Sequence, residues 1–140
     1  MKKNILLELE FLYESNKIEG VYDALSLLDA CRAWKHLRFK KEIAIKDILE
    51  IHRLLAFNSD LQKRNIGTFR QELVWIGGRE CKPWQVIPEL MEQWCGKVNE
   101  AFTGARNIKN DEEKTKAFHV AFEKIHPFID FNGRTGRLLL

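Results

Sequence analysis

Residues 125–137 read IHPFIDFNGRTGR and bring a histidine, a carboxylate, an amide and two arginines into one short stretch. The proline predicts that the preceding helix ends at His126, because the residue before a proline is pushed out of the helical region. Asn132 is a favourable cap for a new helix with Gly133 in its first turn. A helix, a polar loop and a helix N-terminus would surround an anion with backbone N–H groups and the positive end of a helix dipole.

The polar side chains of this stretch suit a phosphate group accompanied by a metal ion. Arg134 and Arg137 offer planar donors to phosphate. Magnesium on a nucleotide needs only one or two protein carboxylates, which Asp130 could supply. The imidazole of His126 can accept a proton near neutral pH. Each residue alone has an ordinary explanation as a cap, a loop residue or a solvated charge, but their combination in one loop favours a functional site.

Other kinds of site fit the sequence poorly. The stretch is not a G-x-x-x-x-G-K-[ST] phosphate loop, and the chain has no G-x-S-x-G nucleophile motif. His119 and His126 lie seven residues apart without a third ligand at the spacing that zinc sites use.

The composition indicates one globular domain. Of 140 residues, 45% are hydrophobic and 31% charged, as is usual for a single soluble domain. No apolar run approaches the roughly 18 residues of a membrane span, and Glu8 and Glu10 interrupt any N-terminal signal core. We therefore expect a cytoplasmic protein without membrane attachment. Three cysteines without a C-x-x-C pair predict reduced thiols, and a net charge of +3 is too small to indicate nucleic acid as a partner.

Apolar residues recur at spacings of three and four along most of the chain, which predicts helices. The expected helices cover residues 2–13, 17–37, 43–57, a segment that starts at residue 88 and ends at Gly104, and a segment that ends at residue 125. Residues 59–86 lose this period, and the stretch from Leu73 to Ile76 followed by two glycines predicts a short β-hairpin. The expected class is all-α with a small β-hairpin, in a single domain over residues 1–140.

Two features of this organisation leave alternatives open. The hairpin is either a surface ornament or a flap whose free edge pairs with an extended peptide. The final helix is cut short at Leu140, and so short a helix is marginal unless its leucines dock. Either the natural chain continues or this helix is short.

Residues 126–137 resemble the signature of Fic-domain proteins, H-x-F-x-[D/E]-G-N-G-R-x-x-R, and match seven of its eight specified positions. Residues 67–70, 74–78 and 88–91 resemble the flap region of that family, here about residues 67–82, and the helix after it. Residues 15–20 read SNKIEG and resemble the family's inhibitory motif, [S/T]-x-x-x-E-[G/N]. The resemblance implies a Fic-type helical domain with an inhibitory helix segment over about residues 1–37.

The resemblance also implies a reaction, the transfer of AMP from ATP to a Ser, Thr or Tyr hydroxyl of a target protein. His126 would be the general base, and Asp130 would hold Mg²⁺ on the α- and β-phosphates. Phe128 would pack inward and anchor the loop. The flap would hold the target by main-chain pairing through Val74, Trp75 and Ile76. The phosphate groups would be bound by Asn132, Gly133, Arg134 and Arg137, with the last nearest the γ-phosphate.

The inhibitory motif implies that Ser15 and Glu19 restrain this activity, with Glu19 reaching Arg137 in place of the γ-phosphate. A carboxylate and a guanidinium form a charge-assisted pair that competes well with a phosphate oxygen. Asn16 followed by Glu19 is also close to a capping box, which needs no active site. Both roles can hold at once.

Phe131 occupies the one signature position that does not match, where the family usually has glycine. Glycine permits positive φ and close approach of a phosphate, whereas phenylalanine restricts φ and adds bulk. If the side chain points away from the nucleotide, the amide can still donate and activity survives. We favour this outcome because all the charged groups remain.

The leading hypothesis is therefore an auto-inhibited protein adenylyltransferase that uses ATP and Mg²⁺. The alternatives are an enzyme that removes AMP or catalyses both directions, and a nucleotide-binding or interaction module whose catalysis is impaired by Phe131. The expected partner is a target protein, with the chain itself as one candidate. A homodimer is compatible with the sequence, and nucleic acid is not an expected partner.

Overall fold

A computed structural model describes residues 2–102 and 108–140, which form six α-helices and one hairpin. The predicted all-α class with a small β-hairpin is confirmed. No helix in these ranges is long and apolar enough to cross a membrane. In chain order the elements are α1 (Lys2–Ile18), α2 (Ala24–Leu37), α3 (Ile45–Leu55), the 3-10 turn η1 (Lys63–Asn65), β1 (Trp75–Ile76), β2 (Arg79–Glu80), the 3-10 turn η2 (Trp84–Val86), α4 (Ile87–Ala101), α5 (Ile108–Ile125) and α6 (Asn132–Leu139).

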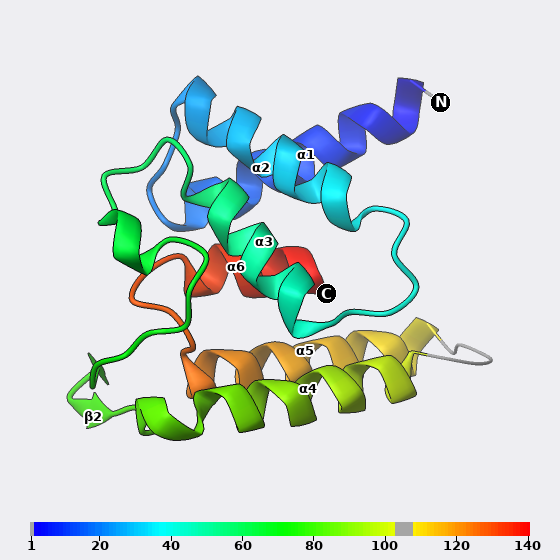
Figure 1. The fold of residues 1–140 in the computed structure, drawn as a ribbon. Coiled ribbons are helices and arrows are strands. Elements are labelled where there is room, and N and C mark those ends of the chain that lie inside the picture. The colour runs from blue at the N-terminus through cyan, green and yellow to red at the C-terminus, as the bar shows by residue number, and fades with distance from the viewer. Residues whose placement is uncertain (1, 103–107) are drawn as a thin grey trace.

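Helix α6 lies at the centre of the fold and contacts α1, α2, α3 and α5 (Figure 1). Helices α4 and α5 run antiparallel beside each other below it (Figure 1). Trp94 of α4 packs edge-on against Phe122 of α5 at 5.3 Å, and its Nε1 donates to the carbonyl of Phe118 at 3.0 Å. Leu138 and Leu139 are buried in the core, so the short α6 is docked by its leucines. Gly104, the predicted end of α4, lies outside the described residues.

The first helix is longer than the sequence pattern predicts. The expected interruption at residues 14–16 is absent, because Ser15 and Asn16 continue the buried stripe that begins at Leu12, and packing overrides their weak helix propensity. The helix ends where Gly20 adopts a φ of 71° and Val21 N donates to the carbonyl of Asn16 at 3.0 Å.

The predicted capping box at Asn16 and Glu19 is wrong. Asn16 lies inside α1, and Glu19 follows the end of that helix. The cap of α2 is instead Asp23, whose carboxylate accepts hydrogen bonds from the backbone N and the hydroxyl of Ser26, both at 2.9 Å. Glu19 therefore has no capping role and is free to project from the turn between α1 and α2.

The hairpin stands beyond the ends of α4 and α5 (Figure 1). Its strands pair antiparallel, with Trp75 opposite Glu80. Gly77 and Gly78 have φ values of 54° and 78°, and two positive φ values in succession match the twist of a tight hairpin turn. The side chains of Trp75 and Ile76 are 62% and 44% exposed, so this small sheet contributes little to the core.

Arg70 links the hairpin to the C-terminal end of α5 by hydrogen bonds. Its side chain is buried, with 1% exposed, and it donates to the carbonyls of Ile125 and His126 at 3.3 and 2.7 Å. The same guanidinium donates to the carbonyls of Glu72 and Lys82, one on each arm of the hairpin. One buried cation thus satisfies carbonyls at the negative end of a helix dipole and closes the base of the hairpin.

We predict that Arg70→Met lowers the free energy of unfolding by an amount on the order of 3 kcal/mol. The substitution leaves the buried carbonyl of Ile125 and the partly buried carbonyl of His126 without this donor, and such groups retain much of the cost of their desolvation. Urea unfolding measures the effect. Arg53→Met is the matched control, because Arg53 forms an exposed pair with Glu50 and should change stability by less than about 1 kcal/mol. Equal losses in the two variants would contradict the role of Arg70.

Candidate active site

A cavity of about 350 Å³ opens where α5 ends and α6 begins. It is lined by the loop between these helices, by the first turns of α6 and by residues of α5 and of the segment after α1. The lining residues are Glu19, His119, Glu123, His126, Ile129, Asp130, Phe131, Asn132, Gly133, Arg134 and Arg137. The cavity therefore collects the polar residues of the Fic-like signature, together with the glutamate of the N-terminal motif.

His126 has an unusual backbone conformation. Helix α5 ends at Ile125 as predicted, but His126 has a φ of 50° rather than the extended conformation that a following proline favours. Its N donates to the carbonyl of Phe122 at 3.0 Å, and Arg70 holds its carbonyl. Burial and the charge of Arg70 lower the pKa of His126 below its ordinary value. The imidazole is therefore neutral near pH 7 and can accept a proton.

Asn132 closes the loop instead of capping α6. Its Nδ2 donates to the carbonyl of Phe128 at 2.8 Å, and its Oδ1 accepts from the N of Phe128 at 2.9 Å. The cap prediction for Asn132 is wrong, because this side chain is buried against the loop and is not aimed at the helix N–H groups. The residue in the cap position is Phe131, which makes no side-chain cap bond.

Asp130 is exposed at the edge of the cavity. Its Oδ1 accepts a hydrogen bond from the N of Phe131 at 2.7 Å. Within the described residues, no hydrogen bond to Oδ2 is formed. This carboxylate is thus fixed by its neighbour and retains an oxygen that can bind a cation.

Arg137 is engaged by the segment at the end of α1. Its Nη2 donates to Glu19 Oε1 at 2.8 Å and to the Ser15 carbonyl at 3.0 Å, while its Nε donates to the Ser15 hydroxyl at 3.0 Å. A Cβ atom added at Gly133 would lie 2.6 Å from Glu19 Oε1. The carboxylate of Glu19 therefore lies directly against the first turn of α6, where an anion is favoured.

Phe131 has a left-handed backbone, with φ 68° and ψ 18°. A non-glycine residue there costs roughly 1–2 kcal/mol. The ring is buried, with 7% exposed, and the Cζ atom of Arg134 lies 3.6 Å from its centroid. The backbone thus takes a conformation that glycine also allows, and the ring packs into the core beneath Arg134.

His52 supports the loop from α3. Its Nδ1 accepts a hydrogen bond from the N of Gly67 at 2.9 Å, so its Nε2 carries the proton and donates to the carbonyl of Asp130 at 2.9 Å. The ring also stacks on Phe128 at 3.8 Å with an interplanar angle of 13°. Burial lowers the pKa of His52 to about 4, so this histidine is neutral and its tautomer is fixed by its two partners.

Three further polar residues at the site are not identified from the sequence. Glu123 and His119 lie four residues apart, so they share one face of α5, and this spacing close to the start of the signature is the signal that could identify them. Burial and the nearby Glu19 raise the pKa of Glu123, against the opposing effects of His119 and Arg137. His52 lies on the apolar stripe of α3, and its distant partners give no sequence signal.

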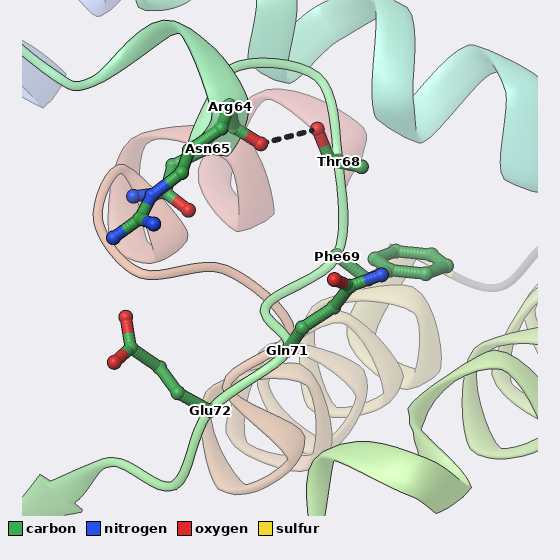
Figure 2. Close-up of a pocket in the computed structure, with 6 residues that line it drawn as sticks. All are labelled: Arg64, Asn65, Thr68, Phe69, Gln71 and Glu72. Carbon is green, nitrogen blue, oxygen red and sulfur yellow. Dashed lines mark hydrogen bonds between the residues drawn. The ribbon is translucent and has the colours of Figure 1, made fainter.

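The predicted flap residues lie away from this cavity. Val74, Trp75 and Ile76 do not line it; the carbonyl of Val74 accepts from the N of Cys81 at 3.0 Å, next to the two strands. A separate hollow of about 240 Å³ lies along the approach to the hairpin. Figure 2 shows the side chains of Arg64 and Glu72 extending to one side of the backbone and the ring of Phe69 extending to the other.

Comparisons with known proteins identify the family. Residues 42–140 match the model of the Fic/DOC family. The chain is 34% identical over 127 residues to protein adenylyltransferase Fic of Drosophila willistoni, and 34% identical over 128 residues to protein adenylyltransferase fic-1 of Caenorhabditis briggsae. Each alignment covers 91% of this chain, which spans 24% of each relative's length.

Solved structures share the fold. A Fic domain containing signaling protein from Bacteroides thetaiotaomicron superposes with a TM-score of 0.76 at 21% identity, over 97% of this chain and 61% of that one. A fragment of Fic-1 from C. elegans gives a TM-score of 0.64 at 23% identity, over 91% and 40% of the two chains. The chain belongs to the Fic/DOC family.

We predict that acidification destabilises the fold through His52. Between about pH 6.5 and pH 4 this histidine binds a proton in the unfolded chain but not in the folded one, so the free energy of unfolding falls as the pH falls through that window. The contribution is on the order of 3 kcal/mol. Urea unfolding at pH 7, 5 and 4 should show a smaller pH dependence in His52→Gln than in the parent. Some pH dependence should remain in His52→Gln, because the pKa of His126 is also lowered. If the free energy of unfolding depends on pH as steeply in His52→Gln as in the parent, His52 is not the group responsible.

Proposed function

We propose that this domain transfers AMP from a nucleoside triphosphate to a hydroxyl group of a target protein. The observation that carries the proposal is the convergence of His126, Asp130 and two arginines on one cavity at the N-terminus of α6. Membership of a family whose relatives are named protein adenylyltransferases supports it.

The first turn of α6 would bind the phosphates. The backbone N–H groups near Gly133 and the positive end of the helix dipole favour an anion here. Arg134 and Arg137 line the same cavity and would donate to the phosphate oxygens, with Arg137 nearest the terminal phosphate. The position of the Glu19 carboxylate supports this assignment, because it shows that a negatively charged oxygen fits against α6.

His126 would act as the general base. Its Nδ1 is buried, which leaves Nε2 for proton transfer. The hydroxyl oxygen of the target would attack the α-phosphorus while its proton passes to His126. A bond forms between that oxygen and phosphorus, the bond from the α-phosphorus to the bridging oxygen breaks, and pyrophosphate leaves. The lowered pKa of His126 keeps its ring neutral, which is the form that accepts the proton.

Asp130 fits a role in binding Mg²⁺. Its exposed carboxylate is fixed through Oδ1, and magnesium usually takes one or two carboxylates with phosphate oxygens and water. The ion would neutralise charge on the phosphates. The hairpin would hold the target segment by pairing along its exposed edge near Val74, Trp75 and Ile76.

Glu19 would restrain this activity. Arg137 already donates to Glu19 and Ser15, so a terminal phosphate would have to displace the carboxylate from the same guanidinium. A phosphate and a carboxylate are alternative partners for one charge-assisted interaction. The cytoplasmic location, the identity of the target, self-modification and a homodimer stay predictions.

A second candidate function uses the same carboxylate. Glu19 shares the cavity with His126, and there it could position a water molecule that removes AMP from a modified target. Release of AMP that is lost in Glu19→Gly would support this direction, whereas AMP incorporation that rises in Glu19→Gly would support transfer.

The burial of Phe131 beneath Arg134 argues against a module that has lost catalysis, because the ring does not replace any charged group of the site.

We predict that Glu19→Gly raises AMP incorporation by roughly 10- to 100-fold, the range expected from removing one charge-assisted competitor of the phosphate. The assay uses labelled ATP with Mg²⁺ and intact mass to detect self-modification. Glu14→Gln is the control, because Glu14 is an exposed glutamate in the last part of α1, outside the cavity, and its replacement should leave the rate unchanged. No incorporation by Glu19→Gly across several nucleotides would count against transfer.

We predict that His126→Ala, introduced into Glu19→Gly, lowers the rate by a factor on the order of 10²–10⁴, the usual contribution of a positioned acid–base group. Calorimetric binding of ATP should change far less, because the phosphate donors remain. A rate that is unchanged after the substitution would exclude His126 as the base.

A further inference from the structure

The side chain of Arg134 stacks on an aromatic ring. Its Cζ atom lies 3.6 Å from the centroid of Phe131, a distance at which a planar guanidinium stacks on a ring face. Its Nε is buried without a hydrogen-bond partner among the described residues. The stacked ring is therefore the contact through which this guanidinium is seated in the site.

The ring is itself held in place. Phe131 meets the ring of His52 edge-on, at 6.0 Å and 83°. His52 is fixed by Gly67 and by the carbonyl of Asp130, and it stacks on Phe128. A continuous set of packed rings thus runs from α3 to Arg134. These contacts hold the backbone of Phe131 in its costly left-handed conformation.

Two carboxylates near Arg134 do not form an ion pair with it. The carboxylates of Asp130 and Glu19 lie near enough to oppose the lowering of the Arg134 pKa that burial causes. No ion pair joins Arg134 to either carboxylate within the described part of the chain. The side chain of Arg134 is thus stacked on Phe131 and is not paired with the carboxylate that would bind the metal.

We propose that Phe131 is a positioning residue that presents the N–H groups of Arg134 to the phosphates of the nucleotide. This inference rests on the proposed function, and it assigns a role to the one signature position where this chain differs from the usual glycine. It opposes the view that the aromatic ring obstructs the site.

The experiment compares Phe131→Leu, Phe131→Gly and Phe131→Tyr, each in the Glu19→Gly background. We expect Kd for Mg²⁺–ATP, measured by calorimetry, to rise roughly 5- to 30-fold in the Leu and Gly variants, as a partly desolvated cation–π contact implies. Phe131→Tyr should keep the parent value because it retains the ring. In an Arg134→Ala background, Phe131→Leu should have little further effect, since the two residues act as one unit.

Phe39→Leu is the matched control, because Arg38 lies 4.9 Å from the exposed ring of Phe39, outside the site. Thermal unfolding checks that every variant is folded. NMR provides a readout that does not depend on nucleotide: the Nε–H proton of Arg134, assigned by its loss in Arg134→Lys, should be shifted by the ring in the parent and should lose that shift in Phe131→Leu.

Equal or tighter binding in folded Phe131→Gly or Phe131→Leu would overturn the proposal, as would additive effects of Phe131→Leu and Arg134→Ala. An Nε–H resonance that is insensitive to Phe131→Leu would overturn it independently of any activity. A Glu19→Gly parent that binds ATP but transfers no AMP would refute the proposed reaction alone, and the binding comparison would still decide the role of Phe131.

Discussion

The buried guanidinium of Arg70 is the interaction on which the arrangement of this domain depends. It binds carbonyls at the C-terminal end of α5 and carbonyls on both arms of the hairpin. The backbone N of the same residue donates to the carbonyl of Pro127 at 2.8 Å. A single residue thereby fixes the point where the candidate base leaves its helix, and it sets the hairpin beside that point. The positive charge of Arg70 also favours the neutral form of His126.

The loop between α5 and α6 is strained and closely held. His126 and Phe131 both have positive φ without being glycine, and each such residue is costly. The loop retains this shape because Asn132 bridges the N and the carbonyl of Phe128 and because His52 holds the carbonyl of Asp130. The result is a rigid turn that directs the N-terminus of α6 into a cavity. The Glu19 carboxylate reaches this arrangement from another part of the chain, the segment after α1, and contacts it through Arg137.

Sequence reasoning is successful here where the signal is local. The period of apolar residues predicts the helical class, two adjacent glycines predict the hairpin turn, and the density of polar residues from 126 to 137 predicts where the cavity lies. Sequence reasoning fails where a residue distant in the sequence determines the conformation or the hydrogen-bond partner of a side chain. The side chains of Ser15 and Asn16 pack inward, so α1 continues through residues that usually end helices. Asn132 resembles a cap in sequence, but its amide finds the backbone of Phe128, and His52 is indistinguishable from an ordinary apolar-face histidine until the loops fold over it.

The central claim is that a polyphosphate takes the place of the Glu19 carboxylate at the first turn of α6. A crystal structure of Glu19→Gly with Mg²⁺ and a non-hydrolysable ATP analogue tests it most directly. The account predicts phosphate oxygens within hydrogen-bond distance of Arg134 and Arg137, with the ring of His126 facing the α-phosphorus. A nucleotide bound elsewhere, or one whose phosphates point away from α6 while His126 is turned from the cavity, would contradict it.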